Sequence, residues 1–209
     1  MKKDNILLVF SIVVVIISLI AASLTYFSIS DFARRITGYG TTANLNLSIE
    51  SSAAINFTTD FINWGSGRVN PGSVAASLTT LGANNVSGGN WTLQQAGGLR
   101  IENIGNVNIT LNLSGGKTAA TFIGGTNPAY EWNITNVESG SCLNSTGGTV
   151  GLNLNTFFNV NTTTATFCPR LRFESGNDFI RIDFNLTIPE NSLTGALTDT
   201  ITAIVTSAA

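Results

Sequence analysis

The side chains of this 209-residue chain that could do chemistry are two cysteines and twelve carboxylates, and histidine is absent. Without an imidazole the chain has no Ser-His or Cys-His pair for nucleophilic catalysis. The carboxylates do not cluster along the sequence, although a fold could still bring two of them together as in a glycoside hydrolase. We therefore expect no catalytic residue, no cofactor and no enzymatic function, and keep a secreted hydrolase as the weakest alternative.

The two cysteines, Cys142 and Cys168, are predicted to form one disulfide. Such a bond closes a loop of about 25 residues and stabilises a fold by about 3 kcal/mol on the chain-entropy estimate. Two buried free thiols are the alternative. A zinc site is not expected, because neither cysteine belongs to a CxxC pair and there is no histidine.

One loop, Glu174–Asp178, carries several oxygen atoms of the kind that bind Ca²⁺. It lacks the spacing of an EF-hand loop, and acidic residues are common in turns between strands. We therefore interpret this loop as a turn and expect no metal.

Asn-x-Ser/Thr triplets occur ten times, and each is a glycan acceptor if it faces solvent on an exported protein. An Asn- and Thr-rich chain also produces such triplets by chance. Predicted loops hold the three strongest candidates, Asn85, Asn144 and Asn161. The remaining candidates are Asn46, Asn56, Asn90, Asn108, Asn112, Asn133 and Asn185.

The element that organises the chain lies at its start, where residues 6–27 contain no charged side chain. A helix over this run is apolar on every side and spans about 33 Å, enough to cross the hydrocarbon core of a bilayer. We predict that this surface makes the membrane or assembly contacts. It comprises Ile6, Leu7, Leu8, Phe10, Val13, Ile17, Ile20, Leu24 and Phe27.

The helical spacing continues beyond the apolar run, so one helix is predicted to occupy residues 1–37. A stripe along this continuation is expected to pack between the stalk and the following domain, and it consists of Tyr26, Ile29, Ala33 and Ile36. A cleaved signal peptide is the alternative, because Ala21 and Ser23 have the spacing of a cleavage site. We favour retention, since the run is longer than the apolar core of a signal peptide.

The rest of the chain is predicted to be β-structure, with a hinge at residues 38–43 and one extracellular domain over 44–209. Short segments that alternate apolar and polar residues are separated by Gly- and Asn-rich turns, which indicates an antiparallel β-sandwich of immunoglobulin-like or jelly-roll topology. The clearest strand is 179–188. The other predicted strands are 44–50, 54–58, 61–64, 73–79, 91–94, 99–103, 108–113, 118–123, 130–137, 149–160, 165–173 and 199–206.

Charged residues make up only 11% of the chain, against about a quarter in ordinary soluble domains. The few basic residues form no stripe, so nucleic acid is not expected as a partner. The predicted disulfide and glycosylation of the sequons both require the non-cytosolic side of the membrane. We therefore expect the β-domain outside the cell and the N-terminus inside.

Together, the basic Met1-Lys2-Lys3, the apolar run through Phe27 and the charge-poor β-region resemble archaeal type IV pilins and related surface-filament subunits. The resemblance implies that apolar helices of neighbouring copies pack as a filament core, with the β-domains outside. It implies a structural protein whose partner is itself, with the membrane as partner before or instead of assembly. The alternative is a single-pass surface protein whose sandwich binds a partner or a glycan.

Overall fold

The computed structural model describes residues 3–36, 47–82, 86–92 and 97–208, and within the N-terminal helix it describes side chains from Leu7 to Ser28. The chain divides into two compact units, Met1–Ser48 and Ile49–Ala209. The predicted hinge at 38–43 lies outside the described residues. Each unit is treated by itself below.

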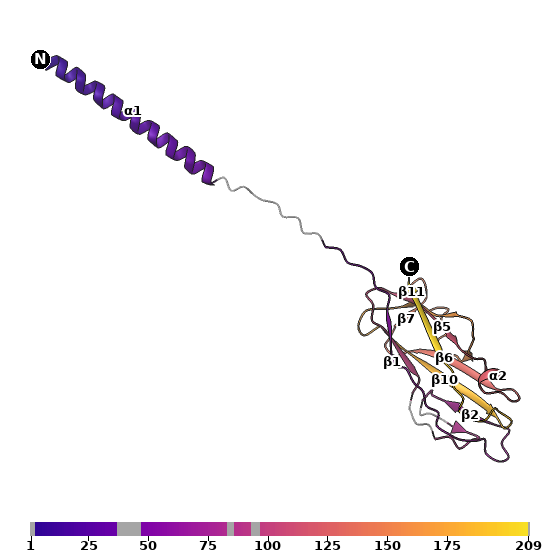
Figure 1. Ribbon diagram of the computed structural model, residues 1–209. Coiled ribbons are helices and arrows are strands. Elements are labelled where there is room, and N and C mark those ends of the chain that lie inside the picture. Colours follow the sequence, from indigo (N-terminus) through magenta and orange to yellow (C-terminus); the bar gives the residue numbers. More distant parts are fainter. Residues whose placement is uncertain (1–2, 37–46, 83–85, 93–96, 209) are drawn as a thin grey trace. The chain divides into compact units, whose positions relative to one another are not determined.

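Helix α1 spans Lys3–Ile36, as the sequence pattern predicts (Figure 1). Its 34 residues correspond to a length of about 51 Å. The hydroxyl groups within the apolar run donate hydrogen bonds to carbonyls one turn back, as Ser18 Oγ does to Val14 O at 2.9 Å. The helix surface therefore carries almost no polar group that still needs a partner from outside.

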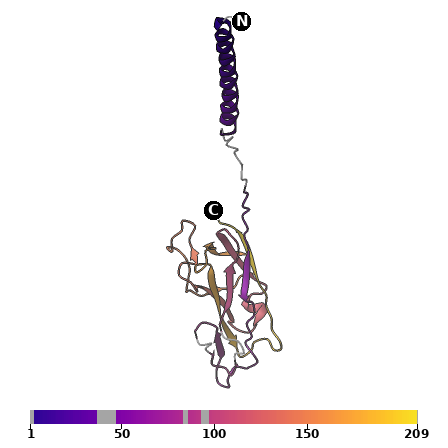
Figure 2. The same cartoon turned by 90° about the vertical axis from the view of Figure 1, so that its left-hand side faces the viewer.

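The strands of the described chain all belong to the second unit (Figures 1 and 2). Seven of them form one antiparallel sheet in which β10 is central, and four form a second in the order β11-β5-β9-β7. The first sheet contains β1 (Ile55–Thr59), β2 (Ala75–Thr79), β3 (Val86–Ser87), β4 (Leu99–Asn103), β6 (Ala129–Asn136), β8 (Phe158–Asn159) and β10 (Phe179–Pro189). The second contains β5 (Ile109–Gly115), β7 (Cys142–Leu143), β9 (Ala165–Leu171) and β11 (Ile201–Ser207). The second unit is the predicted antiparallel β-sandwich, and in the sequence it follows one long apolar helix.

Strand β10 holds the first sheet together. One of its edges pairs with β6 over residues 180–187, and its other edge is shared by β4 and β2. Thr80 spans the gap between these two strands, because its backbone N–H donates to Phe184 O and its Oγ1 accepts the Phe184 N–H at 2.9 Å. A side-chain oxygen thus replaces the strand carbonyl that is missing there.

The core lies between the two sheets and is built from alternate residues of each strand. Trp132 is fully buried at its centre and packs edge-to-face on Phe167, with ring centroids 4.4 Å apart. Ile180, Ile182, Phe184 and Leu186 of β10 all point into this core, as their period-2 spacing predicts.

Asp183 lies on the predicted polar face of β10, yet it is completely buried. Its carboxylate accepts Arg181 Nε at 2.7 Å and Thr80 Oγ1 at 3.0 Å. These charge-assisted and neutral hydrogen bonds replace the lost water. The outer face of this sheet is therefore covered here, which alternation alone does not reveal.

Several local predictions were wrong. Residues 118–123 were expected as a strand but contain the short helix α2 (Ala119–Phe122), where Thr121 Oγ1 accepts the Thr118 N–H and two alanines favour the helix. Residues 61–64 form no strand, the described part of 44–50 forms none, and 149–160 contains only β8. Segment 91–94 falls partly outside the described residues. Strands β3 and β7 lie in stretches that were expected to be loops.

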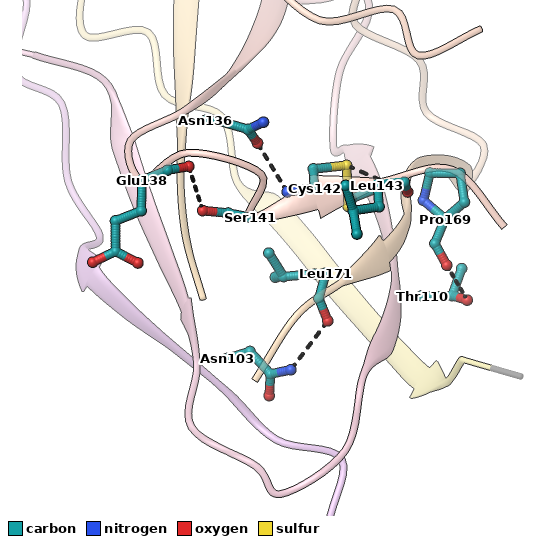
Figure 3. Close-up of a disulfide and its surroundings, with 10 residues drawn as sticks. Asn103, Thr110, Asn136, Glu138, Ser141, Cys142, Leu143, Pro169 and Leu171 are labelled. Carbon is teal, nitrogen blue, oxygen red and sulfur yellow. Dashed lines mark hydrogen bonds between the residues drawn. A yellow bond between two sulfur atoms is a disulfide. The ribbon is translucent and has the colours of Figure 1, made fainter. Parts of the chain in front are cut away.

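The predicted disulfide is present and joins β7 to the adjacent strand β9 (Figure 3). Its cysteines, Cys142 and Cys168, are fully buried with Cα atoms 5.7 Å apart. Asn136 Oδ1 accepts the Cys142 N–H at 2.9 Å, which ties β7 to the end of β6 in the other sheet. The bond therefore fixes a two-residue strand that has little pairing of its own.

Candidate functional site

The apolar surface of α1 is exposed all round. Of the residues predicted to make assembly or membrane contacts, the eight with described side chains are 46–70% exposed, and the Ile6 side chain lies outside the description. Residues Leu7–Ser28 form a 22-residue stretch long and apolar enough to cross a membrane. A signal sequence near an N-terminus also meets these minimum criteria of length and composition, so this feature establishes a membrane-type surface and not its final location.

The stripe expected to join the stalk to the domain is described only at Tyr26, whose side chain is 73% exposed. The side chains of Ile29, Ala33 and Ile36 lie outside the description. Packing of this stripe against a β-domain stays a prediction.

A second candidate site is a cavity of about 430 Å³ in the β-domain, here called the aromatic pocket. Its lining comes from β1 and the segment after it, from the segment before β11 and the first residue of β11, and from β4, α2, β6 and β10. The lining residues are Phe57, Asp60, Phe61, Ile62, Trp64, Leu99, Phe122, Tyr130, Phe184, Leu197, Thr198, Asp199, Thr200 and Ile201. Its volume falls in the range of small-molecule sites.

Three aromatic rings in contact, those of Phe122, Tyr130 and Phe184, belong to the buried part of this lining. The centroid of Tyr130 lies 4.8 Å from that of Phe122 and 6.0 Å from that of Phe184. All three side chains belong to the hydrophobic core, so they are held rigidly. Phe61 is 58% exposed, so its part of the pocket lining faces solvent.

Two carboxylates, Asp60 and Asp199, line the same pocket from different segments. The Tyr130 hydroxyl donates a hydrogen bond of 3.1 Å to Asp199 Oδ2. Burial, followed by the negative charge of Asp199, raises the pKa of Tyr130 above its usual range, so this phenol stays protonated as a donor. Gly116 leaves room for Asp199, because a Cβ there would lie 2.7 Å from its Oδ1.

A larger cavity of about 700 Å³ adjoins the aromatic pocket and shares Trp64, Phe122 and Leu197 with it. Trp64 is half-buried and lines both cavities. The signal in the sequence that could have indicated this site was the run Asp60-Phe61-Ile62-Asn63-Trp64, which combines an acid and two aromatic residues.

Comparisons with protein-family models, curated proteins and solved structures found no match. The helix surface and the pocket are therefore the features of the chain that bear on its function. Two carboxylates in one cavity are what the hydrolase alternative requires. The rest of this lining is mainly aromatic and aliphatic, which favours binding over bond cleavage.

The candidate glycan acceptors differ in their exposure to solvent. Asn56, Asn90 and Asn161 are exposed, whereas Asn108, Asn112 and Asn185 are half-buried and Asn46 and Asn85 lie outside the description. Asn133 is 1% exposed, so this fold leaves no room for a glycan on it. Asn144 holds its own loop, because its Oδ1 accepts the Gly148 N–H at 2.8 Å and its Nδ2 donates to Val150 O.

The two carboxylates of the loop considered for Ca²⁺, residues 174–178, have different partners. Glu174 accepts Arg172 Nε at 3.0 Å, while the Asp178 carboxylate lies near Glu138 and Glu102. Among the described residues no group of three or more Cys, Asp and Glu side chains is placed to hold a metal ion. The acidic turn is the interpretation that the geometry supports.

Replacing Asp178 with Asn is expected to stabilise the domain at pH 7 by less than about 1 kcal/mol. Burial, with repulsion from Glu138 and Glu102, raises the Asp178 pKa, so the folded state binds this proton more tightly than the unfolded chain does. Stability therefore falls as pH rises through this pKa. Denaturant unfolding should show the gain at pH 7 and little gain at pH 3.

Glu174→Gln is the matched comparison, because it is expected to lower the stability of the domain at pH 7 where Asp178→Asn raises it. Hydrogen bonding from its own backbone N–H, followed by Arg172, lowers the Glu174 pKa, so its charged form favours folding above the unfolded-state value. Equal effects of the two variants at both pH values would contradict these assignments.

Proposed function

We propose that the chain is a structural subunit of an extracellular surface filament and that its copies associate through α1. The observation that carries this proposal is the exposure of apolar side chains on every side of the helix from Leu7 to Ser28. Burying each large apolar side chain is worth about 1.5–3 kcal/mol, so this surface does not stay in water. Other copies of the same helix provide a cover that is equally apolar on all sides.

Three further features support assembly outside the cell. The internal hydrogen bonds of Ser11, Ser18, Ser23 and Thr25 let the helix pack in a dry environment. The disulfide is typical of exported proteins. The sequence also resembles archaeal type IV pilins in its basic start, its long apolar helix and its charge-poor β-region.

The second candidate function is a single-pass surface protein whose sandwich binds a partner while α1 stays in the bilayer. The aromatic pocket is the specific observation that favours it, because a purely structural domain has no need of an open aromatic cavity.

Shearing of producing cells followed by lipid fractionation distinguishes the two. The filament proposal predicts that full-length chain is released by shear as fibres free of lipid. Chain that stays with the lipid fraction after shear, with no fibres in the supernatant, would contradict it and favour the anchored protein.

A further inference from the structure

The aromatic pocket combines apolar walls with negative charge. Six of its lining residues are aromatic, Phe57, Phe61, Trp64, Phe122, Tyr130 and Phe184, and Asp60 and Asp199 are its charged members. The described lining includes no Lys or Arg. An occupant therefore meets ring faces and carboxylates in the same cavity.

Within the described part of the chain, neither Asp60 nor Asp199 forms an ion pair. The ion pairs found among the described residues are Arg172 with Glu174 and Arg181 with Asp183. Lys117 lies between β5 and α2, and its Nζ donates to the carbonyl oxygen of Thr198, the residue before Asp199, at 2.5 Å. Among the described residues Asp199 accepts a neutral hydrogen bond from Tyr130 and forms no ion pair, so no direct contact with a cation neutralises its charge.

This charge distribution selects among ligand classes. An anion would be repelled, and a wholly apolar ligand would strip water from two carboxylates without replacing it. A sugar could donate hydroxyl hydrogen bonds to the two carboxylates, but it would leave their negative charge without a counter-ion. A cation on an apolar stem meets both requirements, since ring faces attract cations and pack on the stem.

We propose that the aromatic pocket binds an organic cation, an ammonium or guanidinium group on an apolar stem, with Asp60 and Asp199 neutralising the charge. The site itself lies within the β-domain and involves no residue of α1, so only a ligand from a neighbouring copy would rest on the proposed filament function. The ligand is either a free small molecule or a lysine or arginine side chain of a neighbouring copy.

The test is titration of the full chain in detergent with n-butylammonium, followed by tryptophan fluorescence and assigned with a Trp64→Phe variant. Saturable quenching or enhancement that depends on Trp64 is expected. n-Butanol has a similar stem without the charge and should bind at least about tenfold more weakly. Equal binding of butanol, or no saturable change with butylammonium, would overturn the proposal.

The variants Asp60→Asn and Asp199→Asn should each weaken butylammonium binding about tenfold and leave butanol binding unchanged. An Asn at 199 keeps an oxygen that can accept the Tyr130 hydroxyl, so the pocket wall is preserved. Glu174→Gln is the matched control, because it removes an acid outside the pocket. Wild-type affinity in both Asn variants would exclude a role for these carboxylates.

Comparison of dissociated chain with sheared filaments identifies the source of the cation. A free ligand predicts the same butylammonium response in both states. A side chain from a neighbouring copy predicts a response in the dissociated chain alone, because the polymer already fills the pocket.

Discussion

Filaments are expected to disappear when Ile17, near the middle of the apolar run, is replaced by Asp. Ile17 is 59% exposed within the chain and so belongs to the surface that other helices or lipid must cover. A charged side chain at this depth costs about 2.5–3.5 kcal/mol on insertion scales, and the cost recurs in every copy of a polymer. Electron microscopy of sheared material measures the loss.

The conservative variant Ile17→Leu serves as the control, because it keeps the volume and the apolar character and should assemble like the wild type. The β-domain of Ile17→Asp should keep its unfolding midpoint, since the substitution lies in the other compact unit. Normal filaments from Ile17→Asp would show that α1 is not the assembly element.

Loss of the disulfide is expected to destabilise the β-domain by about 3 kcal/mol, which corresponds to a melting temperature lower by roughly 6–12 °C for a domain of this size. The bond connects residues 26 apart and fixes the short strand β7 against β9. Thermal unfolding of a Cys142→Ala and Cys168→Ala double variant measures the effect.

Reduction of the wild-type protein provides a matched comparison, since it breaks the same bond without removing the sulfur atoms. It should lower the melting temperature by a similar amount. A double variant as stable as the oxidised wild type would mean that packing alone holds β7 in place.

Helix α1 could be predicted from the sequence because its signal is long and purely local. Uncharged, apolar residues over more than twenty positions favour a helix in any setting without water, and no distant part of the chain is needed to decide it. The disulfide was predictable for a similar reason, because two cysteines allow only one intramolecular pairing.

Strands were predicted well where apolar and polar residues alternate in the sequence, as in β5 and β10. The prediction failed at residues 118–123, whose two alanines and buried Phe122 form a helix that alternation counting cannot distinguish from a strand. It also failed at 149–160, where polar turns separate the apolar residues, Leu154 makes only an isolated bridge to β6, and Phe158–Asn159 is the one strand.

The aromatic pocket could not be predicted, because its parts are far apart in the sequence. Asp60 and Asp199 come together only through the order of strands in two sheets, and Tyr130 reaches Asp199 from a third element. The burial of Asn133 and Asp183 was hidden for the same reason. These residues alternate like surface positions, and their burial depends on which segments cover the outer face of the sheet.

The central claim is that α1 remains in the finished protein and is its means of assembly. Intact-mass spectrometry of fibres sheared from producing cells tests this most directly. The account predicts a mature chain that still contains the whole run from Leu7 to Ser28. A mature chain that begins after Ser23 and is found as a soluble monomer in the medium would contradict it.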